Sequence, residues 1–173
     1  MIFTITELEH HPILYDVVYH PGEIELPDEL RQVGGLHVKG STELLKNTLG
    51  EIRLQGHITV EIEAACDRCL EPAKVPVDSD FDLFYRPLET VETHGEIHLE
   101  EGEIEISFYE GDSVALREVL REFVLLSLPM RTVCSEECQG LCPVCGENRN
   151  QRACGCNVAH HDERWAGLKG LEL

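Results

Sequence analysis

The chain has 173 residues, with 14 Lys and Arg against 33 Asp and Glu, and a formal net charge of −19 at pH 7. This net charge repels phosphate, which argues against nucleic-acid binding over a broad face, and it would attract a basic protein partner. The alternative is that the acidic residues form a solvated surface that keeps the protein soluble. A chain of this length can bury a core without crosslinks, so its eight cysteines are not required as a disulfide scaffold.

The opening residues, MIFTITELEHHPILYD, lack the positive segment and apolar run of a signal peptide. No window of the chain approaches the ~20 apolar residues that a membrane-spanning helix needs. We therefore expect a soluble, cytoplasmic protein with reduced thiols.

Alternation of apolar and polar residues predicts strands in the first two thirds of the chain. The clearest is 57–65, whose apolar face is formed by Ile58, Val60, Ile62 and Ala64. Further strand signals lie at residues 15–19, 35–40, 51–56, 81–85 and 102–108. In the last of these, Ile104, Ile106 and Phe108 repeat the pattern. The sequence thus predicts a mainly antiparallel sheet or a barrel-like domain.

A helical period replaces this pattern at residues 113–128, which begin with the N-cap candidate Ser113 and stop before Pro129. The apolar positions at helical spacing are Leu116, Val119, Leu120, Phe123 and Val124. The charged positions, which we interpret as intrahelical pairs without a function, are Arg117, Glu118, Arg121 and Glu122. We expect one long amphipathic helix that packs on the sheet.

The domain organisation follows from these elements, and the predicted class is α+β. Residues 1–129 are expected to form the β domain with its helix, and residues 130–173 a small Cys-rich, zinc-binding segment with a Trp-containing tail. The stretch 89–112 holds nine Asp or Glu and no Lys or Arg, and around 89–102 we expect a long loop. No internal repeat is evident.

Six of the eight cysteines lie within residues 134–156. In CPVCG, the two-residue spacing of Cys142 and Cys145 lets both thiolates face one point, and Gly146 tolerates the turn. The CGC of Cys154 and Cys156 supplies the partner half. The sequence therefore predicts a tetrahedral four-thiolate zinc site at these four cysteines, with a structural role.

The other four cysteines form two further pairs. Cys66 and Cys69, in CDRCLEP, are expected at a hairpin end between two strands, and Cys134 and Cys138 are spaced for one face of a helical turn. Together they could make a second four-thiolate site. Two alternatives stay open: Cys134 or Cys138 replaces a ligand of a single site, or the extra thiols are small buried hydrophobes.

Catalytic interpretations find less support in the sequence. The CxxC pairs could act in thiol–disulfide exchange, but no helix begins at either of them. An all-cysteine site leaves no open position for a catalytic water. His160 and His161 could offer ligands, although adjacent residues in a polar tail seldom do so together. We expect no enzyme.

The order of the motifs resembles the YceD-type family, which is named for large ribosomal RNA subunit accumulation. The residues that carry the resemblance are CDRCLEP, a helix ending in LPM, CSEECQGLCPVCGENRNQRACGC and DERWAGLKGL. It implies a bacterial or organellar protein needed for accumulation or processing of large-subunit ribosomal RNA, without established catalytic activity. Glu163 stands where the family commonly has Pro.

Two residues are candidates for partner binding. Trp165 lies in a segment with apolar residues every third position, where a short helix closing the core is the alternative. Arg68 could contact phosphate or a partner carboxylate, or could pair with acidic side chains of its own chain.

The leading hypothesis is a non-catalytic ribosome-biogenesis factor whose acidic domain engages a basic protein, such as a ribosomal protein or an RNA-processing factor. Direct RNA binding is the second hypothesis, since the segment from Arg131 onward is nearly neutral, with five Lys or Arg and six Asp or Glu. A redox protein that uses Cys66 and Cys69 is the third.

Overall fold

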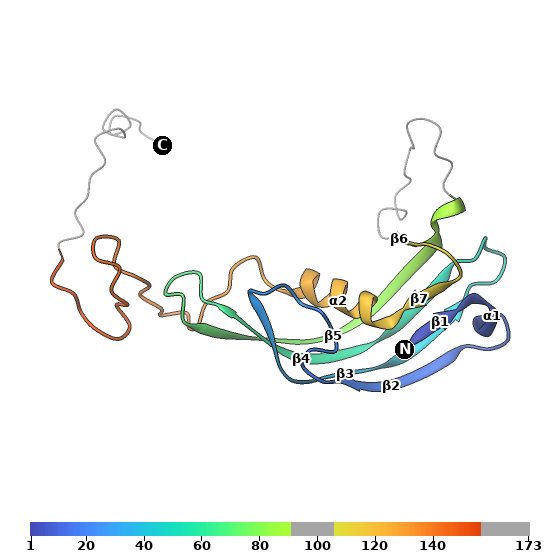
Figure 1. Ribbon diagram of the computed structural model, residues 1–173, viewed down its shortest axis with the longest axis horizontal. Helices are drawn as coiled ribbons and strands as arrows, with labels where there is room; N and C mark the ends of the chain where they lie inside the picture. Colours follow the sequence, from blue (N-terminus) through green and yellow to red (C-terminus); the bar gives the residue numbers. More distant parts are fainter. Residues whose placement is uncertain (91–105, 157–173) are drawn as a thin grey trace, which may run out of the picture. The chain divides into compact units, whose positions relative to one another are not determined.

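A computed structural model describes residues 1–90 and 106–156 of the chain (Figure 1). The chain divides into two compact units. We call Met1–Ala64 with Lys74–Met130 the strand unit, and Ala65–Ala73 with Arg131–Leu173 the cysteine unit. The short segment 65–73 thus belongs with the C-terminal part of the chain, although strands precede and follow it.

Strands dominate the described residues, and the mainly β character predicted from the sequence is confirmed. The strands are β1 (Ile2–Thr4), β2 (Ile13–Tyr19), β3 (Leu30–Leu44), β4 (Ile52–Ala65), β5 (Pro72–Pro87), β6 (Ile106–Tyr109) and β7 (Ser113–Ala115). The helical segments are α1 (Ile5–Leu8), the 3-10 turn η1 (Leu88–Thr90) and α2 (Leu116–Ser127). No helix in the described ranges is long and apolar enough to cross a membrane.

The main sheet has five strands in the order β2-β3-β4-β5-β6, and β1 pairs with β7 in a second, two-stranded sheet (Figure 1). The pairs β1–β7, β2–β3 and β3–β4 are antiparallel, whereas β5 and β6 run parallel. Within residues 1–90 and 106–156, β2 and β6 are the two edges of the main sheet. The barrel-like alternative is therefore wrong for this part of the chain, because nothing described closes the sheet on itself.

Alternation along β4 sets the two faces of the main sheet. Ile58, Val60 and Ile62 are buried, whereas His57 and Thr59 are exposed, as the period of two requires. Gly40 of β3 lies opposite Gly56 of β4, and a Cβ atom at Gly40 would collide with the carbonyl oxygen of Gln55. Glycine is thus needed there for the close approach of the two backbones.

Helix α2 covers one face of the main sheet, where the Phe81 and Phe123 rings lie 5.3 Å apart between centroids (Figure 1). Its buried residues are Leu116, Val119, Leu120 and Val124. The predicted start at Ser113 is wrong: residues 113–115 form β7, and Ala115 precedes the helix without a side-chain cap. The reason is tertiary, because Val114 pairs with Phe3 in the core and strand pairing outweighs the local capping signal.

The expected charge pairs along α2 do not form among the described residues. At the four-residue spacing, Arg117 faces Arg121 and Glu118 faces Glu122, so these neighbours carry like charges. Glu118 and Arg121, three apart, carry opposite charges but form no ion pair in the described ranges. Arg121 instead donates from Nε to the Glu25 carbonyl oxygen at 2.6 Å.

The acidic stretch around 89–102 lies largely outside the described residues, as does Ile104. At the described end of the following strand, the predicted pattern is wrong in one respect. Phe108 is 46% exposed, whereas its neighbour Tyr109 is buried. Tyr109 belongs to the buried core, and its hydroxyl donates to the Gly50 carbonyl oxygen at 2.7 Å.

Helix α2 offers a matched test of core packing. Leu120 is 0% exposed and Leu126 is 85% exposed on the same helix. We expect Leu120→Ala to lower the free energy of unfolding by about 2–5 kcal/mol, because it removes buried methyl groups and leaves a cavity. Leu126→Ala is expected to change it by less than about 0.5 kcal/mol. Urea unfolding of both variants tests this, and equal effects would contradict the assigned faces of α2.

Candidate metal centres in the cysteine unit

The connection between β4 and β5 folds into a knuckle over CDRCLE, residues 66–71. The Cys66 N–H donates to the Glu71 carbonyl oxygen at 2.8 Å, and the Leu70 N–H donates to the Cys66 carbonyl oxygen at 2.8 Å. Leu70 has a φ of 62°, in the left-handed region that side chains other than glycine seldom adopt. This turn directs Cys66 and Cys69 toward one point, at the hairpin end that the sequence predicts.

A second knuckle over CPVCGE, residues 142–147, repeats the first bond for bond. The Cys142 N–H donates to the Glu147 carbonyl oxygen at 2.8 Å, and the Gly146 N–H donates to the Cys142 carbonyl oxygen at 2.8 Å. Gly146 has a φ of 74°. The pattern C-x-x-C-x-E therefore occurs twice with one geometry, a short repeat that the sequence analysis overlooked.

The first group of cysteines is Cys66, Cys69, Cys134 and Cys138, whose sulfur atoms all lie within 4.8 Å of one another. The Cys66–Cys138 sulfurs are 3.8 Å apart and the Cys69–Cys134 sulfurs 3.6 Å. A tetrahedron with metal–sulfur bonds of roughly 2.3 Å has edges of about 3.8 Å, so these spacings fit one ion. They exceed the roughly 2.05 Å of a disulfide, and all eight cysteines are free.

Backbone pairing brings the two halves of this group together. The Asp67 N–H donates to the Thr132 carbonyl oxygen at 2.8 Å, and the Thr132 N–H donates to Asp67 Oδ2 at 2.7 Å. Cys66, Cys69 and Cys138 are buried, and Cys134 is exposed. The group is thus largely shielded from solvent.

The second group is Cys142, Cys145, Cys154 and Cys156, again with all sulfur atoms within 4.8 Å of one another. Only Cys142 in this group is buried; Cys145 is exposed and the other two are half-buried. The structure thus brings together both sets of sulfurs named from the sequence. Whether an ion binds at either set stays a prediction.

The thiols within each group differ in acidity. Burial opposes ionisation of Cys66, but N–H groups of Cys134, Arg68 and Cys69 outweigh it and lower its pKa to about 6. N–H groups of Cys145 and Val144 likewise lower the pKa of Cys142 to about 6. The neighbouring Cys145 sulfur and burial raise the pKa of Cys156 to about 12.

The physical reason for this spread is charge repulsion, because several thiolates this close cannot all ionise without a cation. The Glu71 N–H favours the Cys69 thiolate, yet burial and the neighbouring thiols raise its pKa to about 12. A divalent ion would remove the repulsion and displace the remaining protons. Tetrahedral four-sulfur sites suit zinc or iron, so the donor set fits the predicted zinc.

Arg68, a candidate for partner binding, makes its contacts inside the cysteine unit. Its guanidinium Nη1 donates to the carbonyl oxygens of Glu136 at 3.0 Å and Cys138 at 2.9 Å. Its own carbonyl oxygen accepts the Leu141 N–H at 2.9 Å. Among the described residues, its guanidinium partners are therefore backbone carbonyls rather than acidic side chains. Trp165, His160 and His161 lie outside the described residues.

Sequence reasoning missed the residues that support the first group. Asn150 Nδ2 donates to the Cys138 sulfur at 3.2 Å, and Asn150 Oδ1 accepts the Gln139 N–H at 2.7 Å. Gln151 and Asn148 donate from their side chains to Glu71 Oε1, at 2.9 Å and 3.3 Å. Polar residues in a tail give no signal for this role. Such partners orient ligands and disperse the charge on sulfur.

Comparison with known proteins places this geometry in a family context. A family model described as "Large ribosomal RNA subunit accumulation protein YceD" matches residues 54–172, which include both cysteine groups. A chloroplastic YCED homolog 1 of Arabidopsis thaliana, named as a large ribosomal RNA subunit accumulation protein, is 26% identical over 159 residues. That alignment covers 79% of this chain and 49% of the relative.

Two further relatives align with similar identity. The chloroplastic YCED homolog 1 of Zea mays is 27% identical over 130 residues, which cover 62% of this chain and 44% of the relative. An uncharacterized protein of Mycobacterium tuberculosis is 27% identical over 157 residues, covering 90% and 71% of the two chains. This chain therefore spans about half the length of the plant relatives. No solved structure matches it.

The two knuckles provide a reciprocal test of backbone strain. Leu70 is 66% exposed, so Leu70→Gly loses little packing and relieves a left-handed conformation that costs about 1 kcal/mol. We expect exchange of the residue 70 amide hydrogen, corrected for its intrinsic rate, to slow about five-fold.

Gly146→Leu is the converse change, since a Cβ atom there would meet no atom within 4 Å and only the φ of 74° opposes it. Exchange of the residue 146 amide is expected to accelerate by a similar factor. Changes of the same sign at both positions would contradict the equivalence of the knuckles.

Proposed function

This chain belongs to the YceD family of large ribosomal RNA subunit accumulation proteins, and on that premise we propose that it is a non-catalytic factor that supports the accumulation of large-subunit ribosomal RNA by binding a basic protein. The family match carries the first half of this proposal. The charge of the chain and the closed character of its cysteine groups support the second half.

Two zinc ions in the cysteine unit form part of the proposal. The ligands are Cys66, Cys69, Cys134 and Cys138 at one site, and Cys142, Cys145, Cys154 and Cys156 at the other. The first ion would hold together segments that are short of apolar residues, since within the described residues the cluster around Cys66 and Cys69 adds only Ala73, Cys138 and Val133. Metal binding would then supply folding free energy that packing alone does not.

A structural role for the ions follows from the ligand count. Four sulfur ligands leave no coordination position for a water or a substrate, which is the arrangement of structural rather than catalytic zinc. The same arrangement argues against thiol–disulfide exchange at Cys66 and Cys69. Both are buried, and each belongs to a group of four rather than to an accessible pair.

A basic protein fits the electrostatics better than RNA does. The net charge of −19 attracts cationic surfaces and repels phosphate. In the described part of the cysteine unit, Arg68 binds backbone carbonyls, which leaves fewer cations for phosphate contacts. Ribosomal proteins and RNA-processing factors are the classes of partner we favour. Direct RNA binding is the competing outcome.

Metal analysis tests the two sites. We expect two zinc ions per chain, and one in each of the variants Cys66→Ser and Cys142→Ser, which each remove a ligand from a different group. Acidification to about pH 5 is expected to release metal, because protons held at Cys69 and Cys156, whose pKa values are raised, compete with the ion for sulfur.

Iron in place of zinc would contradict the choice of metal. A metal-free protein whose thiols are still reduced would contradict both sites. Loss of both ions in either variant would show that the groups are not independent.

Depletion of the protein from its host tests the function. We expect the ratio of large- to small-subunit ribosomal RNA to fall, and to recover with the wild-type chain and with Leu126→Ala, but not with Cys66→Ser. An unchanged ratio would contradict the proposed role.

Partner class is tested separately, by affinity purification with and without ribonuclease. A basic protein that is retained after ribonuclease treatment is expected. Binding of purified RNA that weakens steeply with salt would instead favour the RNA alternative.

A further inference from the structure

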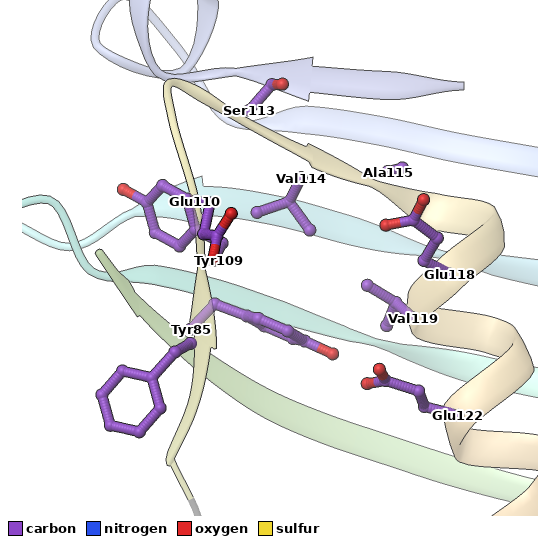
Figure 2. Close-up of a pocket in the computed structure, with 10 residues that line it drawn as sticks. Tyr85, Tyr109, Glu110, Ser113, Val114, Ala115, Glu118, Val119 and Glu122 are labelled. Carbon is purple, nitrogen blue, oxygen red and sulfur yellow. The ribbon is translucent and has the colours of Figure 1, made fainter. Parts of the chain in front are cut away.

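The strand unit contains a hollow of about 380 Å³ beside the start of α2, lined by parts of β5, β6, β7 and the helix (Figure 2). Its aromatic wall is formed by Tyr85, Phe108 and Tyr109. Tyr85 is only 6% exposed, and its ring extends into the hollow toward α2 (Figure 2). Phe108, by contrast, is nearly half exposed.

Three carboxylates accompany the aromatic wall: Glu110, Glu118 and Glu122. None of these three glutamates forms an ion pair within residues 1–90 and 106–156. On the exposed face of the main sheet, by contrast, acidic residues are paired with basic ones. In one such pair, Arg53 Nη2 lies 2.7 Å from Asp82 Oδ2. The hollow thus collects negative charge that the described chain does not neutralise.

Repulsion between two of these carboxylates destabilises helix α2. Glu118 and Glu122 are four residues apart on α2, and both carboxylates lie on the side of the hollow (Figure 2). Like charges at this spacing destabilise a helix by about 0.2–0.5 kcal/mol. Burial and the adjacent Glu122 carboxylate also raise the pKa of Tyr85 to about 12, which indicates a weakly solvated site next to negative charge.

A metal ion does not account for these features. The carboxylates do not converge to within 4.8 Å of one another, and the two cysteine groups are the only sets in the described residues that do. A planar organic cation fits better, because guanidinium stacks on aromatic rings and donates hydrogen bonds to several separated carboxylates. The aliphatic stem of such a side chain would pack on Val114 and Val119.

We propose that this hollow receives an arginine side chain of the basic protein partner. The proposal rests on the proposed function for the existence of that partner and deepens it by naming where and how the partner is held. The stretch 89–105 next to the hollow in sequence contains no Lys or Arg. Two cations of this chain outside the described residues, Arg164 and Lys169, could fill the hollow in place of a partner's arginine, and the test below includes them.

The experiment measures binding of a fluorescein-labelled arginine nonapeptide by anisotropy at low salt, with the citrulline nonapeptide as its uncharged counterpart. Citrulline keeps the shape of arginine without the charge, so no binding of that peptide is expected. The triple variant Glu110→Gln, Glu118→Gln, Glu122→Gln is expected to bind the arginine peptide about ten-fold more weakly than wild type. Phe108→Leu is expected to weaken binding about three-fold by removing one aromatic face.

The matched control is the triple variant Glu9→Gln, Asp28→Asn, Glu29→Gln. It removes the same charge at exposed positions of the strand unit that have no ion pair in the described residues and do not line the hollow. Its affinity is expected to fall by less than about two-fold, through the net charge alone. Thermal unfolding of each variant verifies that the fold is intact.

Equal losses in the two triple variants, or binding of the citrulline peptide, would overturn the proposal. Binding that tightens about ten-fold in Arg164→Gln, Lys169→Gln would overturn assignment to a partner, because the chain would then fill its own hollow. The depletion experiment separates failure of this proposal from failure of the proposed function. If depletion lowers the ratio of large- to small-subunit ribosomal RNA, but the triple variant at Glu110, Glu118 and Glu122 binds the arginine peptide as tightly as wild type, only the arginine site is refuted.

Discussion

The arrangement of the cysteine unit depends on one constraint, the convergence of four sulfur atoms at a time within a few ångströms. In the first group, Cys66 and Cys138 come from segments 72 residues apart in the chain. Thiolates at such separations repel one another, and the spread of their pKa values is the record of that repulsion. A divalent cation would outweigh this repulsion, because each thiolate would be attracted to the ion.

The repeated knuckle shows how a backbone can be adapted to this constraint. Six residues, C-x-x-C-x-E, place two sulfurs on one side and satisfy the turn with two backbone hydrogen bonds, once at residues 66–71 and once at 142–147. The fifth position must be left-handed in both copies. Glycine fills it in one copy without strain, and an exposed leucine fills it in the other. The left-handed backbone at Leu70 is held by the hydrogen bonds of its own knuckle, from the Leu70 N–H to the Cys66 carbonyl oxygen and from the Cys66 N–H to the Glu71 carbonyl oxygen.

The strand unit shows a different use of charge. On the exposed face of the main sheet, acidic residues are paired with basic ones across neighbouring strands, as Lys74 is with Glu61 and Arg31 with Glu63. Beside α2, the acidic residues Glu110, Glu118 and Glu122 lie near aromatic rings and have no ion pair within the part of the chain that the structure describes. The first arrangement serves solubility and adds little stability. The second one leaves a local field that favours a cation, which is consistent with a basic partner for an acidic member of this family.

The sequence by itself determined the features that depend on neighbours along the chain. Alternation over 57–65 predicted the inner and outer faces of β4, and the two-residue cysteine spacings predicted the knuckle at Cys142 and Cys145 and the hairpin-end pair of Cys66 and Cys69. Tertiary structure decided the features that depend on distant residues. Val114 pairs with Phe3, so the expected first turn of the helix forms β7 instead. The described strands form an open sheet rather than a barrel, and β6 pairs with β5 in parallel. Both sets of four sulfurs were named from the sequence, but for Cys66, Cys69, Cys134 and Cys138 two alternatives stayed open, because spacing along the chain does not decide which distant pairs meet in space.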